Sequence, residues 1–184
     1  MAILSSGRAL LDAPAILTRA GLASGMRYAD FGCGPLGHFV IPASEIVGPE
    51  GRVFAVDVLK SVLASLEDRI RVEMAKNISV VWGDFERPSG VAVPSGSFHL
   101  VSVVNIVPIL LRSADAVAEV RRTLRPDGKL LLVDWIKEDT AIGPPVEQRV
   151  NAAEAELILT KAGFTLKQTF AAGPYHWAQV FSLV

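Results

Sequence analysis

The chain has 184 residues, of which 51% are hydrophobic, with a formal net charge of −1 and a single cysteine. This length and apolar content fit one folded domain over residues 1–184 and exclude a disordered chain. The near-neutral charge gives no general attraction to nucleic acid or anionic lipid, and one cysteine excludes an internal disulfide framework. The start of the chain does not have the pattern of a signal peptide, and the longest apolar run, residues 98–111, is too short to cross a bilayer. We expect a soluble cytoplasmic protein.

Helices and strands are predicted to alternate over the first half of the chain. Helical spacing of hydrophobic residues, short apolar runs and glycine or proline stop signals define these elements. They are a helix over 9–20, a strand over 25–31, a helix over 39–46, a strand over 52–58, a helix whose apolar face runs from Leu59 to Met74, and a strand over 77–82.

The second half continues the alternation and ends in two consecutive strands. The pattern predicts an α/β fold with a doubly wound, mostly parallel sheet and an antiparallel C-terminal hairpin. Its elements are a loop over 86–97, strands over 98–104 and 129–136 with a helix over 113–124 between them, a loop over 137–150, a last helix opened by Asn151 and Glu154 and closed by Gly163, and strands over 164–170 and 176–184.

A glycine-rich segment joins the first strand to the next helix. Gly32, Gly34 and Gly37 let the backbone turn tightly and come close to a ligand, and the amides at the start of the helix are free to face it. Asp57 ends the next strand, where a carboxylate can accept both hydroxyls of a ribose. The pair predicts a nucleoside-binding unit.

Five segments together resemble the class I S-adenosylmethionine-dependent methyltransferases, notably the small-molecule type related to ubiquinone/menaquinone and arsenite methyltransferases. They are residues 30–34, Asp57, residues 83–85, residues 97–101 and residues 124–129, and the resemblance runs from about Leu11 to the C-terminus. It implies a Rossmann-like methyltransferase fold with a seven-stranded sheet, and S-adenosyl-L-methionine as cofactor.

The resemblance also implies which residues bind the cofactor. Asp30 and the loop amides would hold the methionine end, Asp57 the ribose, and Asp84 with Phe85 the adenine. The full predicted set is Asp30, Gly32, Cys33, Gly34, Gly37, Asp57, Val58, Gly83, Asp84, Phe85 and Asn105. We expect no metal ligand. The catalytic residues stay unknown; if the acceptor must lose a proton, His38 and His176 are the candidate bases.

The methyl acceptor is expected to be a small molecule. Ligands of open α/β sheets bind beyond the carboxyl ends of the strands, which here means near Asn105, Asp134 and Trp135. Asn105 is not followed by the Pro-Pro-aromatic motif of amino-group methyltransferases, which disfavours a nucleobase or glutamine amide acceptor. We expect no nucleic-acid or membrane partner, and a homodimer is left open.

Two other functions remain open. The chain could bind S-adenosylmethionine without turnover, as an interaction or regulatory module, because a fold does not imply an activity. The spacing of the three glycines also fits an NAD-dependent oxidoreductase, although Asp30, the Gly83-Asp84 segment and the terminal hairpin disfavour it. An aromatic cluster, residues 175–177, packs on the sheet edge or contacts the acceptor, and the group Arg121, Arg122, Arg125 and Lys129 is expected to be an exposed helix face rather than a nucleic-acid site.

Overall fold

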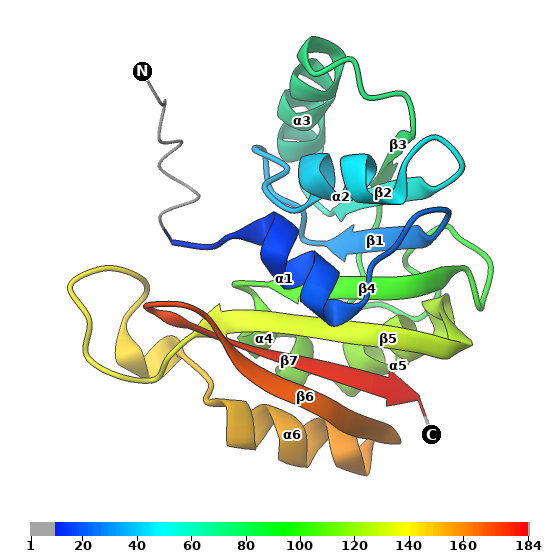
Figure 1. Cartoon of the computed structure of the whole chain (residues 1–184). Helices are drawn as coiled ribbons and strands as arrows, with labels where there is room; N and C mark the ends of the chain where they lie inside the picture. Colours follow the sequence, from blue (N-terminus) through cyan, green and yellow to red (C-terminus); the bar gives the residue numbers. More distant parts are fainter. Residues whose placement is uncertain (1–9, 184) are drawn as a thin grey trace.

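A computed structural model describes residues 10–183, which form one mixed sheet with helices on both of its faces (Figure 1). The seven strands are hydrogen-bonded in the order β3-β2-β1-β4-β5-β7-β6. The elements in chain order are α1 (Ala13–Ala20), β1 (Arg27–Phe31), α2 (Val40–Val47), β2 (Arg52–Asp57), α3 (Lys60–Val72), β3 (Ile78–Trp82), β4 (Phe98–Val104), α4 (Val107–Arg112), α5 (Ala114–Thr123), β5 (Leu124–Trp135), the 3₁₀ turn η1 (Val146–Gln148), α6 (Ala152–Lys161), β6 (Phe164–Gly173) and β7 (His176–Leu183).

The sheet is parallel except at β7. Strands β1 to β5 pair in parallel, whereas β7 runs antiparallel to both β5 and β6. This arrangement confirms the predicted doubly wound sheet with a C-terminal hairpin. The first strand, β1, lies in the middle of the sheet. The next two strands, β2 and β3, extend the sheet on one side of β1, and β4 then pairs with β1 on its other side. Ligands of such sheets bind at this reversal, beyond the carboxyl ends of β1 and β4.

Two hydrophobic cores cover the two faces of the sheet. The first joins α1, α2 and α3 to the sheet through residues such as Leu17, Val40 and Leu66. The second joins α4, α5 and α6 through Leu110, Val120 and Leu159. The central strands are therefore buried on both faces, which explains their nearly continuous apolar sequences. Of the helices within residues 10–183, none combines the length and apolar character needed to cross a bilayer.

Two helices differ from their predicted extent. α1 begins at Ala13 because the Asp12 side chain accepts a hydrogen bond from the amide of Ala15 and caps the helix; the predicted start at Ala9 lies outside the described residues. On α3 the predicted apolar face is too long, since Leu59 and Met74 are 57% and 79% exposed.

The segments around β4 and β5 also differ from the prediction. α4 was not predicted, although Pro108 in its first turn is a normal helix-start signal. β5 begins at Leu124 instead of Lys129, because Leu124 pairs with Phe98 across an irregular register, so the predicted turn over 126–128 lies inside the strand.

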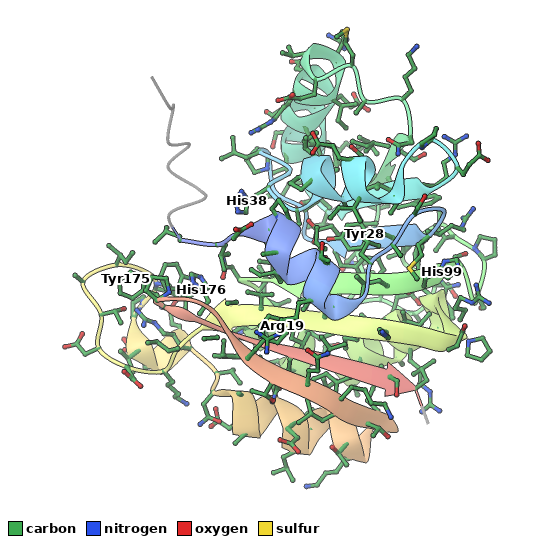
Figure 2. The ribbon with its side chains drawn as sticks, viewed as in Figure 1. Arg19, Tyr28, His38, His99, Tyr175 and His176 are labelled. Carbon is green, nitrogen blue, oxygen red and sulfur yellow. The ribbon has the colours of Figure 1, made fainter. Side chains whose placement is uncertain are left out.

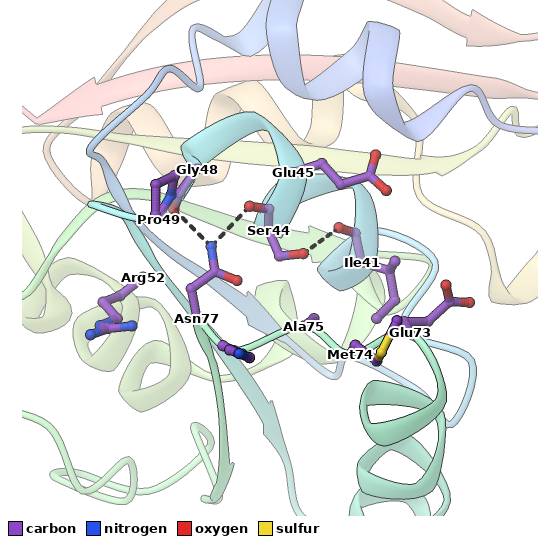
Figure 3. Close-up of a pocket in the computed structure, with 11 residues that line it drawn as sticks. Ile41, Ser44, Glu45, Gly48, Pro49, Arg52, Glu73, Met74, Ala75 and Asn77 are labelled. Atoms are coloured by element: carbon purple, nitrogen blue, oxygen red, sulfur yellow. Dashed lines mark hydrogen bonds between the residues drawn. The ribbon is translucent and has the colours of Figure 1, made fainter.

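A hollow at the amino ends of β2 and β3 is held together by a side-chain amide (Figure 3). The Nδ2 atom of Asn77 donates hydrogen bonds to the carbonyl oxygens of Ser44 and Gly48, at 2.9 and 2.8 Å. These bonds satisfy carbonyls at the end of α2. This hollow lies at the opposite end of the strands from the glycine loop, so we assign it a structural role.

Candidate functional site

The glycine loop after β1 is shaped by two of its glycines. Gly32 has a φ of +75° and its amide donates a hydrogen bond of 2.8 Å to the carbonyl of Val56, which ties the loop to β2. Gly34 has a φ of +65°, and a Cβ on it would meet no atom of residues 10–183 within 4 Å. The loop is thus fixed to the sheet on one side and open on the other. The side chain between these two glycines, Cys33, is buried, and burial raises the pKa of its thiol, as suits a small packing residue rather than a redox thiol.

Asp57 lies at the carboxyl end of β2, directly beside this loop. Its Oδ2 atom accepts a hydrogen bond of 3.4 Å from the amide of Gly34, and its Oδ1 atom accepts one of 2.9 Å from the amide of Leu59. The structure therefore brings together the loop and the acid that the sequence paired. Carboxylate oxygens have further lone pairs, so these backbone contacts leave capacity for a ligand hydroxyl.

Asp30 stands beneath the loop in a buried chain of hydrogen bonds. The Tyr28 hydroxyl donates to Ser102 Oγ, and Ser102 Oγ in turn donates to Asp30 Oδ1, each at 2.5 Å. Asp30 is 3% exposed, and burial raises its pKa to about 7 against the opposing effect of the Ser102 hydrogen bond. Neither Tyr28 nor Ser102 was among the predicted site residues, because a polar residue inside an apolar strand gives no sign of its partner.

The ends of β2 and β3 form a shelf next to the loop. Gly83 donates its amide to the carbonyl of Asp57, at 3.1 Å. The Asp84 carboxylate accepts hydrogen bonds from the amide of Glu86 and from Arg87 Nε, at 3.1 and 2.9 Å. These contacts hold Asp84 at the carboxyl end of β3, where the sequence analysis placed it.

Two aromatic residues on this shelf point in different directions. The Phe85 ring stacks on Phe31 with centroids 5.7 Å apart and is buried, so it belongs to the core and its ring does not face a surface ligand. Trp82, which the sequence analysis did not select, is 53% exposed and donates its indole N–H to the carbonyl of Val58, itself 50% exposed. The exposed apolar surface of the shelf thus comes from Val58 and Trp82.

The two candidate histidines lie in different parts of the structure (Figure 2). His38 directly follows Gly37, in the segment between β1 and α2. His38 Nε2 is 3.0 Å from the carbonyl oxygen of Leu11, beside the start of α1. His176 begins β7, is 1% exposed, and packs against the Trp135 ring with centroids 4.2 Å apart. Among the described residues neither ring nitrogen of His176 has a hydrogen-bond partner. Burial, together with the nearby Arg149 cation, lowers its pKa to about 4. The His38 ring is thus engaged with Leu11, and the His176 ring is enclosed against Trp135.

A cavity of about 860 Å³ opens beyond the carboxyl ends of β4 and β5. Asn105, in a left-handed conformation with φ +60°, and Asp134 contribute polar groups to it, and Ile106, Ile109 and Val150 are among its apolar walls. Asn105 and Asp134 thus lie where the acceptor was expected, whereas Trp135 is not among the described residues that line the cavity.

Asp134 is the buried carboxylate of this cavity. Its oxygens accept hydrogen bonds from the amides of Val107 and Trp135, at 2.9 and 2.7 Å. Burial raises its pKa to about 6, although both hydrogen bonds and the charge of Arg149 act in the opposite direction. A carboxyl group with this pKa can exchange a proton near neutral pH.

Arg149 organises the segment that walls the cavity. Its guanidinium donates hydrogen bonds to the carbonyl oxygens of Ile136, Glu138, Ile142 and Pro144, at 2.8 to 3.2 Å, and to the hydroxyl of Thr140. It is 3% exposed. The segment over 137–150 is a mostly exposed loop with one short 3₁₀ turn, as predicted. Arg149 makes it an ordered strap, and no sequence pattern signalled that one arginine would hold it.

Comparisons with known proteins agree with this geometry. Residues 29–128 match a family model described as a methyltransferase domain. The chain is 28% identical over 141 residues to a ubiquinone/menaquinone biosynthesis C-methyltransferase UbiE of Pseudomonas fluorescens, covering 76% of this chain and 54% of that protein. It is 30% identical over 124 residues to a nocamycin O-methyltransferase of Saccharothrix syringae, covering 65% of this chain and 43% of that one. The chain thus spans about half the length of these curated relatives.

A solved structure extends the match to almost the whole chain. A SAM-dependent methyltransferase from Aquifex aeolicus superposes with a TM-score of 0.91 at 26% identity, covering 98% of this chain and 94% of that one. The predicted family resemblance and fold are confirmed. Because the family model matches more than half of its length, the chain belongs to the methyltransferase-domain family, and S-adenosylmethionine is its cofactor.

Proposed function

We propose that the chain transfers a methyl group from S-adenosylmethionine to a small molecule bound beyond β4 and β5. The observation that carries the proposal is the position of Ile106. This residue packs against Gly32 of the glycine loop and also lines the cavity that contains Asp134. The cofactor loop and the cavity therefore share a wall, as a reaction between two bound molecules requires.

The residues around the loop fit the cofactor. The open side of Gly34 is a cradle that any Cβ would fill, and Asp57 beside it can accept ribose hydroxyls. We assign the adenine to the shelf of Val58, Trp82 and Asp84, with Phe85 contributing backbone rather than its ring. Asp30 fixes the floor through its bond with Ser102. When bound, S-adenosylmethionine supplies a methyl group activated by a positively charged sulfur.

Asp134 is the group we assign to orienting the acceptor. Both of its oxygens are held by backbone amides, so its position is fixed before the acceptor binds. It can accept a hydrogen bond, and at neutral pH a proton, from an acceptor O–H or N–H group. We do not assign this role to the two histidines, because each is engaged elsewhere. His38 contacts the carbonyl oxygen of Leu11, and His176 is enclosed against Trp135.

The contacts of the basic residues bear on whether the chain binds nucleic acid. Arg122 is engaged with Glu119 and with the carbonyls of Val91 and Val93. Arg125 pairs with Asp127. These contacts support an architectural role for Arg122 and Arg125 instead of a nucleic-acid site. We further propose a cytoplasmic location, since the single cysteine fits a reducing compartment.

A transfer assay tests the proposed function. The protein is incubated with methyl-labelled S-adenosylmethionine and fractionated small-molecule extracts, and both labelled product and S-adenosylhomocysteine are measured. We expect stoichiometric formation of the two with at least one fraction, and loss of both with Asp134→Asn while S-adenosylhomocysteine still binds. Cofactor binding without turnover on any fraction would favour the binding-module alternative.

A further inference from the structure

A groove extends from the acceptor cavity along α4, α5 and α6. It has a volume of about 490 Å³ and shares the lining residues Leu111, Arg112 and Ile158 with the cavity that contains Asp134, so the two hollows adjoin each other. On α6, Glu154 lines the cavity, Ile158 lines both hollows and Lys161 lines the groove. At a rise of 1.5 Å per residue this stripe is about 10 Å long. The cavity and groove together therefore suit an elongated molecule.

The groove combines an apolar floor with a cationic rim. Its apolar surface includes Val117 and Ile158, and its cations are Arg112, Arg121 and Lys161. Of the residues that the structure describes, no Asp or Glu lines it. Within residues 10–183 none of these three cations forms an ion pair with a carboxylate. Arg121 Nη1 donates a hydrogen bond of 2.9 Å to the carbonyl of Ala162, which fixes its guanidinium at the edge of the groove. In a chain of net charge −1, this is a local concentration of unneutralised positive charge.

The acceptor cavity, which adjoins the groove, has a different charge. The cavity contains Asp134, Glu147 and Glu154 beside its cations, and Lys137 there is paired with Glu154 at 3.4 Å. An anionic group is therefore attracted to the groove end and gains nothing at the cavity end. This asymmetry orients an elongated ligand, with its anion near Arg121 and its proton-bearing end near Asp134.

We propose that the groove binds an apolar arm of the methyl acceptor that ends in an anionic group, a carboxylate or a phosphate. This inference rests on the proposed function for the identity of the cavity's occupant. The apolar arm covers Val117 and Ile158, and the terminal anion binds Arg112, Arg121 and Lys161. The groove thereby selects amphiphilic anions over neutral or cationic molecules of the same length.

Calorimetric titration with short amphiphiles tests the groove. The probes are octanoate, octyl phosphate and octyltrimethylammonium, added to the full chain saturated with S-adenosylhomocysteine. We expect one or both anions to bind, more weakly at high salt, and the cation not to bind. The anion that binds more tightly distinguishes a carboxylate from a phosphate terminus. Equal binding of the cationic probe, or no binding of either anion, would overturn the proposal.

Matched variants locate the binding. Arg112→Gln and Lys161→Gln should each weaken binding of the preferred anion by at least fivefold. Lys167→Gln, which removes one charge from exposed β6, should leave it unchanged. Ala118→Glu places an anion in the groove and should abolish octyl anion binding while S-adenosylhomocysteine binding is retained. Anion binding that survives Ala118→Glu would contradict the assignment.

The experiment also separates failure of the groove from failure of the proposed function. If S-adenosylhomocysteine fails to bind the unaltered chain, the proposed function fails, and with it the groove as an acceptor site. Failure of the octyl anions alone removes only the groove.

Discussion

The side chain of Ile106 occupies the space that a Cβ on Gly32 would need. This contact joins the glycine loop after β1 to the segment that follows β4. Any side chain at residue 32 must therefore displace the wall between the cofactor loop and the acceptor cavity, in addition to straining a backbone of φ +75°.

Gly32→Ala is expected to weaken S-adenosylhomocysteine binding by at least tenfold. Gly25→Ala is the matched control, because Gly25 has a similar φ of +77° but a Cβ there meets no atom of the described residues within 4 Å. The control should lose about 1 kcal/mol of stability from backbone strain and keep its ligand affinity. Calorimetry on both variants measures the difference, and equal affinities would show that Ile106 does not matter for the loop.

Shortening Ile106 should restore part of the ligand affinity that Gly32→Ala loses. Ile106→Ala added to Gly32→Ala removes the atoms that clash, so we expect the double variant to bind S-adenosylhomocysteine more tightly than Gly32→Ala alone. Ile106→Ala by itself is the reference for the double-mutant cycle. Strictly additive effects of the two substitutions on the binding free energy would contradict the contact.

Ser102→Ala should destabilise the chain more than Tyr28→Phe does. The first change leaves two buried groups, the Tyr28 hydroxyl and the Asp30 carboxyl, without their shared partner, at a cost of about 2–3 kcal/mol. The second removes one donor and leaves Ser102 bonded to Asp30, at a cost of about 1 kcal/mol. Urea unfolding of both variants measures the order, and a reversal would mean that Asp30 does not depend on Ser102.

How far the sequence predicts this site is seen by comparing Asp57 with Phe85. Asp57 was placed beside the loop because chain order alone brings the ends of neighbouring parallel strands together, and the structure has its carboxylate 3.4 Å from the Gly34 amide. Phe85 follows a correctly placed strand, but its ring turns into the core against Phe31. A side chain's direction depends on packing partners far away in the sequence, which a local pattern does not contain.

The fold was predictable where local sequence patterns mark the elements, and the prediction failed where no such pattern exists. Apolar runs and glycine stops marked every strand, whereas α4 was missed because six residues are too few for a helical period to appear. The Arg149 strap was missed because its order depends on one side chain bonding to carbonyls up to 13 residues away. Long-range hydrogen bonds of this kind leave no periodic trace.

His176→Phe should remove the loss of stability that His176 causes on acidification. The folded pKa of His176, about 4, lies below the value of about 6.5 of an unfolded histidine, so its stabilising contribution is complete above pH 6.5 and is lost as the pH falls toward 4. We expect the free energy of unfolding of the unaltered chain to fall by about 2 kcal/mol relative to His176→Phe between pH 7 and pH 5.

The difference between the two proteins is the informative quantity. Asp30 and Asp134, whose pKa values are raised by burial to about 7 and about 6, act in the opposite direction, since their contributions are lost as the pH rises; both remain in the variant and cancel. Urea unfolding at both pH values provides the measurement. If the free energy of unfolding of the unaltered chain does not fall relative to that of His176→Phe between pH 7 and pH 5, His176 is not held neutral.

The most direct measurement is calorimetric titration of the chain with S-adenosylmethionine, S-adenosylhomocysteine and NAD in parallel, repeated on Asp57→Ala. Asp68→Ala is the control, because it removes an exposed carboxylate from α3, away from the loop. Micromolar binding of both adenosyl ligands, lost in Asp57→Ala and kept in Asp68→Ala, is the predicted result. Binding of NAD alone, or adenosyl binding that survives the loss of Asp57, would contradict the proposed site.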